Sequence, residues 1–309
     1  MTTVDHAGAA PAERQAAPWD PSQRHRMLTS DGTALHVRES GPSTAEVTVV
    51  LVHGWTQDNT CWEPVADRLS GDVRVLRYDH RGHGASAPAV PGSATIEQLA
   101  DDLAELIDKR VPAGRLVLAG HSMGGMTIMA LAERYPELVA QRVVGSAFVA
   151  TSSGQMDRLT LGLPDLAARR VPQVESALQV LLEKRRKDTL PGNPRLLSPA
   201  TRWLVFGKRA RQADVLDVTR QALRAHPVSI AGFRDSMRGH DRRVALAALR
   251  DKATLVLVGD RDRLCPVEHA QVIADQLPDA EYVLYPGAGH MLTYERSREV
   301  AEHINDLIT

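Results

Sequence analysis

From residue 25 onward, short apolar runs rich in Val and Leu alternate with longer stretches that are apolar on one side only. Most of these runs stop near a Gly or Asp after a few residues, which is too short for a helix and typical of a strand buried on both faces. Residues 25–38, broken by Asp31-Gly32, indicate a leading β-hairpin. Further strands are predicted at 47–54, 73–79, 115–122, 143–151, 253–260 and 280–287.

The stretches between these runs have helical periodicity. Residues 94–110 carry acidic side chains early and basic ones late, as a surface helix prefers, and 267–277 and 297–308 follow a similar pattern. The apolar positions of the first stretch lie at helical spacing: Ile96, Leu99, Leu103 and Ile107. Strands that alternate with helices predict an α/β fold, with a mostly parallel sheet covered by helices on both faces.

The alternation stops between about residues 152 and 226, where helical stretches without a convincing strand are separated by prolines. We interpret this segment as a helical insertion. Its apolar side chains either line an acyl pocket or pack the insertion against the core, and the sequence leaves both interpretations open. They are Met156, Leu159, Leu161, Leu163, Trp203, Leu204 and Phe206.

Basic residues are concentrated in the insertion. They cluster at 184–187 and again at Lys208, Arg209 and Arg211. A solvated helix face is the simpler interpretation, and a docking surface for acidic substrates or lipid headgroups is the alternative.

The pattern divides the chain into a flexible N-terminal arm (1–22), a core (23–151 and 227–309) and a helical cap (152–226). The arm is rich in Ala and Pro, and it lacks the basic start and apolar run of a secretory signal. No apolar run approaches the roughly 18 residues that a membrane-spanning helix requires. We therefore expect a cytoplasmic protein without a membrane span.

Composition narrows the classes of partner. A formal net charge of −1 over 309 residues gives no overall field that would attract nucleic acid. Cys61 and Cys265, the two cysteines, are too few for a disulfide framework and lack metal-site spacing. They fit a reducing compartment and are expected to be inert.

The segment Gly120-His121-Ser122-Met123-Gly124 follows a predicted strand directly and opens a helical stretch. In that context G-x-S-x-G indicates a nucleophile on a sharp strand-to-helix turn, where flanking glycines avoid a steric clash. The helix N-terminus favours negative charge on an attacked carbonyl oxygen. Ser122 is the candidate nucleophile, and a plain Gly-rich turn is the alternative.

A serine nucleophile needs a base and a group that orients the base. His290 follows the last predicted strand, at the sheet edge where α/β sites gather. The acid is expected between serine and histidine in the chain, where Asp260 and Asp262 both follow the strand at 253–260. We favour Asp262, which lies further into the loop, and keep Asp260 as the fallback.

An oxyanion hole is expected from two backbone amides. The residue after the nucleophile, Met123, supplies one, and Trp55, in the loop after the strand at 47–54, is the candidate for the other. The His-rich turn at 79–84 lacks an accompanying acid or cysteine ligand set, so we expect no metal there and no cofactor.

Taken in order, these motifs resemble the α/β-hydrolase superfamily, in particular its capped serine esterase, lipase and haloperoxidase-like branch. The resemblance covers nearly the whole chain from about residue 25, and it implies an eight-stranded sheet with the cap inserted after the sixth strand. It also supports Asp262, since the family's acid follows Gly-Asp-x and precedes a proline by four positions. The matching segments are 53–55, 79–84, 120–125, 259–266 and 289–290.

The resemblance implies hydrolysis of a carboxylic ester or thioester of a small to medium apolar molecule through an acyl-enzyme on Ser122. A serine at this position disfavours epoxide hydrolases and haloalkane dehalogenases, which use a carboxylate. The alternatives are an acyl transferase or cyclase, a C–C hydrolase or lyase with the same three residues, and a ligand receptor that retains them.

Overall fold

The computed structural model describes residues 25–69, 71–156, 173, 177, 181, 182, 184 and 187–308. The predicted arm, 1–22, lies outside these residues, as do Leu159, Leu161 and Leu163 of the insertion. The basic cluster at 184–187 is described only at its two ends.

The core is one eight-stranded sheet with strand order β1-β2-β4-β3-β5-β6-β7-β8. The first two strands form the predicted hairpin, β2 is antiparallel to β4, and all other neighbours are parallel. The strands predicted from the apolar runs are thereby confirmed, as is the α/β-hydrolase-type sheet. They are β1 (Arg26–Leu28), β2 (Ala34–Ser40), β3 (Val47–Val52), β4 (Arg74–Tyr78), β5 (Arg115–His121), β6 (Val143–Val149), β7 (Ala253–Gly259) and β8 (Glu281–Tyr285).

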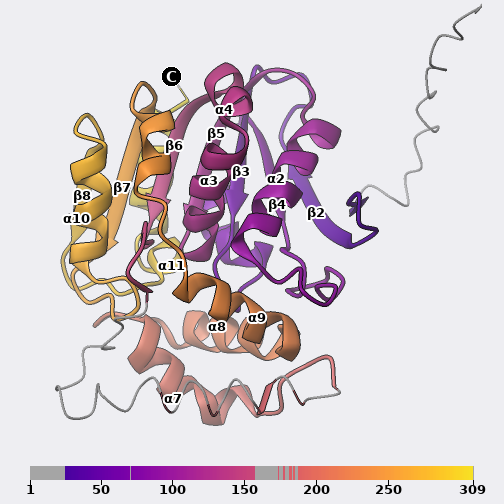
Figure 1. The fold of residues 1–309 in the computed structure, drawn as a ribbon. Coiled ribbons are helices and arrows are strands. Elements are labelled where there is room, and N and C mark those ends of the chain that lie inside the picture. The colour runs from indigo at the N-terminus through magenta and orange to yellow at the C-terminus, as the bar shows by residue number, and fades with distance from the viewer. Residues whose placement is uncertain are drawn as a thin grey trace, which may run out of the picture.

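Helices cover both faces of the sheet, which explains the continuous apolar runs (Figure 1). On one face α2 and α3 pack with η4 and α10, and on the other α1, α11 and α12 enclose a second apolar cluster. Outside the insertion, the helical elements are η2 (Asn59–Trp62), α1 (Glu63–Ala66), α2 (Ile96–Arg110), α3 (Met123–Arg134), α4 (Pro136–Arg142), η4 (Val244–Leu249), α10 (Val267–Gln276), α11 (Leu292–Glu295) and α12 (Ser297–Asp306).

Between β6 and η4 the described chain forms helices and no strand. The helices described over their full length are α7 (Pro194–Val205), α8 (Gln212–Arg224) and α9 (Pro227–Arg238), which lie beyond one end of the sheet in Figure 1. They contact loops that follow parallel strands: Trp55 Nε1 donates to the Ile230 carbonyl at 3.0 Å, and His226 N donates to the Gly82 carbonyl at 2.8 Å. His226, at the predicted end of the insertion, and α9, which follows it, therefore lie over the carboxyl edge of the sheet.

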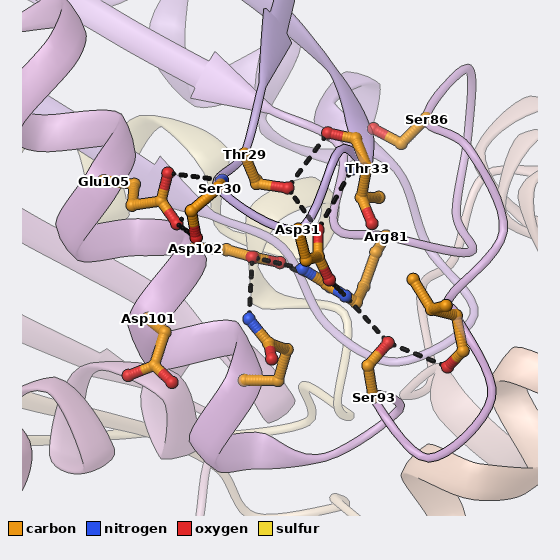
Figure 2. A network of polar contacts seen from close by, with 12 residues as sticks. Thr29, Ser30, Asp31, Thr33, Arg81, Ser86, Ser93, Asp101, Asp102 and Glu105 are labelled. Atoms are coloured by element: carbon orange, nitrogen blue, oxygen red, sulfur yellow. Dashed lines mark hydrogen bonds and ion pairs between the residues drawn. The ribbon is translucent and has the colours of Figure 1, made fainter.

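A buried arginine organises the turn after β4. The Arg81 side chain is fully buried, and its guanidinium donates to both carboxylate oxygens of Asp102 on α2, at 2.7 and 2.5 Å. It also donates to Asp31 and to Ser93, each at 2.7 Å (Figure 2). The leading hairpin, the loop before α2 and α2 itself are thereby held around one cation. Sequence patterning missed this network, because Asp102 occupies a position that looks like the polar side of a surface helix.

Three buried histidines pack where β3 and β4 end. The His53 Nε2 accepts from the His80 amide at 2.8 Å, and the His83 Nε2 accepts from the Thr56 amide at 3.2 Å. Both rings must therefore be neutral, since a protonated ring nitrogen cannot accept. Burial lowers the pKa of His53 and His80, and burial together with His53 lowers that of His83 to about 3. The cluster fixes the backbone of the loop after β3.

We expect Arg81→Met to lower the free energy of unfolding by about 3–5 kcal/mol, because it leaves the buried Asp102 carboxylate without its partner. The double variant Arg81→Met/Asp102→Leu should recover most of this loss, since it removes both charges. Urea unfolding of the three proteins measures both values. Equal stability of the single variant and the parent would contradict the role assigned to Arg81.

The buried histidines should make the fold sensitive to acid. Below pH 6.5 these histidines become protonated in the unfolded chain, whereas the buried rings of the folded protein stay neutral. The stability that each ring contributes is therefore fully present above pH 6.5 and is lost as the pH falls toward 3. Each such ring contributes a slope of about 1.4 kcal/mol per pH unit. His83→Gln keeps a hydrogen-bond acceptor but cannot titrate, so its unfolding free energy, measured between pH 7.5 and 4.5, should fall less steeply than that of the parent. An unchanged slope would argue against the buried neutral ring.

Candidate active site

Ser122 occupies the strand-to-helix turn predicted between β5 and α3. Its backbone has φ 53° and ψ −120°, a conformation that costs about 1–3 kcal/mol in a residue with a side chain. The surrounding backbone leaves no room for larger neighbours: a Cβ on Gly120 would lie 2.5 Å from the Gly124 carbonyl carbon, and one on Gly124 would lie 2.2 Å from the Val52 oxygen. The two glycines of the motif are thus required by close packing of the turn.

Neighbouring strands and the helix hold this strained residue by its main chain. The Ser122 amide donates to the Val149 carbonyl at 3.0 Å, and the Thr151 hydroxyl donates to the Ser122 carbonyl at 2.6 Å. The same carbonyl accepts from the amides of Gly125 and Met126. The backbone is fixed from two sides, while the Ser122 side chain stays partly exposed above the carboxyl edge of the sheet.

The structure brings His290 and Asp262 together. The His290 Nδ1 donates to Asp262 Oδ2 at 2.8 Å, and both side chains are buried. The other oxygen, Asp262 Oδ1, accepts from the amides of Leu264 and Cys265 at 2.8 and 2.9 Å. The carboxylate is therefore immobilised with one oxygen presented to the imidazole.

Asp260, the fallback acid, lies elsewhere. Its Oδ1 accepts from the Gly287 amide at 2.7 Å, and its side chain is 34% exposed beside Arg261. The Asp260 side chain thus ties the loop after β7 to the backbone of the loop after β8, and no hydrogen bond joins it to the His290 ring within the described residues.

The loop that carries His290 lies against the turn at Ser122. The ring of His121, the residue before Ser122, donates from Nε2 to the His290 carbonyl at 2.8 Å, and the two rings lie 4.8 Å apart. Burial and the neighbouring His290 lower the pKa of His121 to about 3, so it is a neutral donor. From the insertion, the Val205 carbonyl accepts from the amides of His290 and Met291 at 2.9 and 3.1 Å. Within the described residues, no hydrogen bond joins the Ser122 hydroxyl to the His290 ring.

The loop after β3 also lies against the turn at Ser122. A Cβ on Gly54 would lie 3.1 Å from the Ser122 Cβ and 2.9 Å from the His121 ring, so the backbone of this loop passes beside the serine. Within the described part of the chain, the amides of Trp55 and Met123 donate to no backbone or side-chain acceptor. Two unpaired amides near a serine are suited to holding an oxyanion.

Several residues of this region gave no sequence signal. Gln57 accepts from the Gly54 amide at 3.0 Å and contacts His121, and Thr151 holds the Ser122 carbonyl. They reach the site from loops whose convergence depends on the sheet order. Met156 and Phe206, candidates for an acyl pocket, are buried in the apolar clusters of the core, whereas Trp203 is 45% exposed.

Possible metal ligands, the cysteines and the length of the helices in the described residues also bear on function. None of them form a group of three or more His, Cys, Asp or Glu side chains that could hold a metal ion, the His-rich turn at 79–84 included. Cys61 and Cys265 are buried and unpaired, and burial raises the pKa of both thiols. No helix of the described chain is long and apolar enough to cross a membrane.

Several known proteins are similar to this chain in sequence or in structure. Yersinia enterocolitica RutD, whose name suggests a carbamate hydrolase, is 27% identical to the chain over 83% of its length and 85% of RutD. The pimeloyl-[acyl-carrier protein] methyl ester esterase of Nitrosomonas europaea is 28% identical over 83% of this chain and 92% of that protein. The solved structure of a thermophilic esterase from Thermogutta terrifontis is similar, with a TM-score of 0.73, 28% identity and coverage of 93% of this chain and 98% of that one.

A family model for serine aminopeptidase, S33, matches residues 43–297. The match spans most of the chain, and it includes the strained Ser122 turn and the loops of Asp262 and His290. The chain therefore belongs to the serine aminopeptidase S33 hydrolase family of the α/β-hydrolase superfamily.

Proposed function

We propose that the protein hydrolyses a carboxylic ester or thioester of a small to medium apolar molecule through an acyl-enzyme on Ser122. The observation that carries the proposal is the buried 2.8 Å contact between His290 and Asp262, in a loop seated on the residue that precedes Ser122. A fixed carboxylate orients the imidazole and stabilises it when it is protonated, as a general base beside a serine requires.

In the proposed reaction, His290 Nε2 takes the proton of the Ser122 hydroxyl as its oxygen attacks the ester carbonyl. The amides of Trp55 and Met123 stabilise the oxyanion. His290 then gives the proton to the leaving alcohol, and the acyl group remains on Ser122. A water that His290 deprotonates releases the acid in a second addition. No step requires a cofactor.

Esters are preferred to amides or carbamates on two grounds. An esterase from Thermogutta terrifontis and a methyl ester esterase from Nitrosomonas europaea are similar to the chain over most of its length. An alcohol is also a better leaving group than an amine, so an ester depends less on proton donation by the single acid and base, His290. Carbamate hydrolysis, which the name of RutD suggests, is the second candidate, and it uses the same addition at Ser122.

The surroundings of the site complete the proposal. The insertion, over the carboxyl edge of the sheet, forms a cap that limits the size of the substrate. Two buried, unpaired cysteines fit a reducing cytoplasm.

The protein should hydrolyse short p-nitrophenyl esters faster than p-nitrophenyl carbamates, and Ser122→Ala should lower ester turnover by about 10³- to 10⁶-fold. The same variant should lose covalent labelling by a fluorophosphonate, because the attacking oxygen is absent. Steady-state kinetics and intact-protein mass spectrometry measure the two effects. Ser30→Ala, at an exposed serine that bonds Glu105, is the matched control and should behave like the parent. Undiminished turnover in Ser122→Ala would remove the nucleophile, and faster carbamate cleavage would favour the second candidate.

Substitution of Asp262 and substitution of Asp260 should have very different effects on turnover. Asp262→Asn removes the charge that stabilises a protonated His290 and should lower kcat by about 10⁴-fold with little change in KM. Asp260→Asn, two residues away, keeps an oxygen for the Gly287 amide and should retain kcat within about threefold. Kinetics of the two variants on one ester decide the assignment, which the reverse order of effects would overturn.

A further inference from the structure

A basic depression lies at the end of α7, outside the residues assigned to catalysis. Its volume is about 410 Å³, and it is formed by the insertion and by the loop after β7. Its walls carry four cationic side chains and one half-exposed indole, with Phe206 beneath. The cations are Arg202, Lys208, Arg261 and Arg263, and the indole belongs to Trp203.

Two of the guanidinium groups are held in place by neutral groups. Arg263 donates to the Trp203 carbonyl at 2.6 Å and lies over the Trp203 ring, 5.0 Å from its centroid. Arg202 donates to the Ala210 carbonyl at 2.8 Å. Carbonyls and an aromatic face orient these cations without neutralising them, so their remaining N–H groups and their charge stay available.

Acidic side chains do not balance this charge. Among the described residues, the nearest ion pair joins Arg261 to Asp260 at 3.8 Å, and Asp260 is already engaged by the Gly287 amide. Arg202, Lys208 and Arg263 form no ion pair within the described chain. Glu295, beneath the floor, is partly buried, and its two oxygens accept from the amides of Gly207 and Gly289. Counted against the two nearby carboxylates, Asp260 and Glu295, the four cations leave about two positive charges in excess.

We propose that this depression binds the phosphate group of a small phosphorylated ligand, with a planar or apolar part of the ligand against Trp203. A phosphate monoester carries nearly two negative charges and three acceptor oxygens, whereas a carboxylate carries one charge and two oxygens. A cluster of several cations therefore fits a phosphate better than a carboxylate. Guanidinium forks suit such a group geometrically, and the ammonium of Lys208 adds a mobile donor. The volume suits a small ligand. A nucleotide and a free phosphorylated metabolite share this chemistry.

The ligand would lie beside segments that support the proposed catalytic residues, without contacting those residues. Arg261 and Arg263 flank Asp262 in the chain, and the Val205 carbonyl, at the end of α7, holds the His290 loop. Binding is expected whether or not Ser122 is the nucleophile, so the two proposals succeed or fail separately.

Titration calorimetry of the full chain at low salt tests the site, with inorganic pyrophosphate and ADP as probes. Both should bind, and tighter binding of ADP would identify the indole as a ring platform. Lys208→Gln and Arg202→Gln should each weaken pyrophosphate about tenfold, as expected for loss of one charge-assisted contact. Arg115→Gln and Arg298→Gln remove exposed cations elsewhere and should leave affinity unchanged.

Three results would overturn the proposal: no binding of pyrophosphate, equal weakening by the control variants, or binding only to phosphatidylglycerol vesicles. Lys208→Gln keeps the test sound if Arg202→Gln unfolds, because no hydrogen bond of the Lys208 side chain supports the described fold. Thermal unfolding of each variant identifies any loss that comes from the fold.

Discussion

The backbone conformation of Ser122 is the constraint on which the rest of the region depends. A residue with a side chain at φ 53° and ψ −120° is unfavourable, so it persists only where the surroundings leave the chain no alternative. Here β6 holds the amide, Thr151 holds the carbonyl, and the backbone of β3 closes against Gly124. Two segments, the end of β6 with Thr151 and the end of β3, thus hold one serine in place, and the strand order of the sheet brings them together.

The histidine rings near this turn are neutral, whereas several carboxylates in the same region are buried, among them Asp79, Asp102 and Asp262. The three histidines beside the loop after β3 accept and donate to backbone groups as uncharged rings. Arg81 and Asp102 form the buried ion pair, and Asp262 is the buried carboxylate that faces an imidazole. Because the former pair is remote from the serine in its contacts, it organises the fold, whereas the latter lies where a proton could be exchanged.

The sequence predicted the strands well because a sheet covered on both faces requires continuous apolar runs, a signal that is local. The hairpin, the helix at 94–110 and the turn at Ser122 follow from equally local patterns. The choice between Asp260 and Asp262 was harder, since it depends on which carboxylate meets the amides of Leu264 and Cys265. Pairings across the chain, such as Arg81 with Asp102, could not be predicted, because a single buried ion pair leaves no periodic trace.

The Val205 carbonyl, which accepts from the amides of His290 and Met291, limits how freely the insertion can diverge. Gly207 adds a steric requirement, since a Cβ there would lie 2.1 Å from the Gly287 oxygen. An exchange of the whole insertion with that of a relative would have to preserve this junction, or the histidine loop would lose its anchor. Sequence change in the insertion is therefore tightly constrained where the chain passes positions 205 to 207.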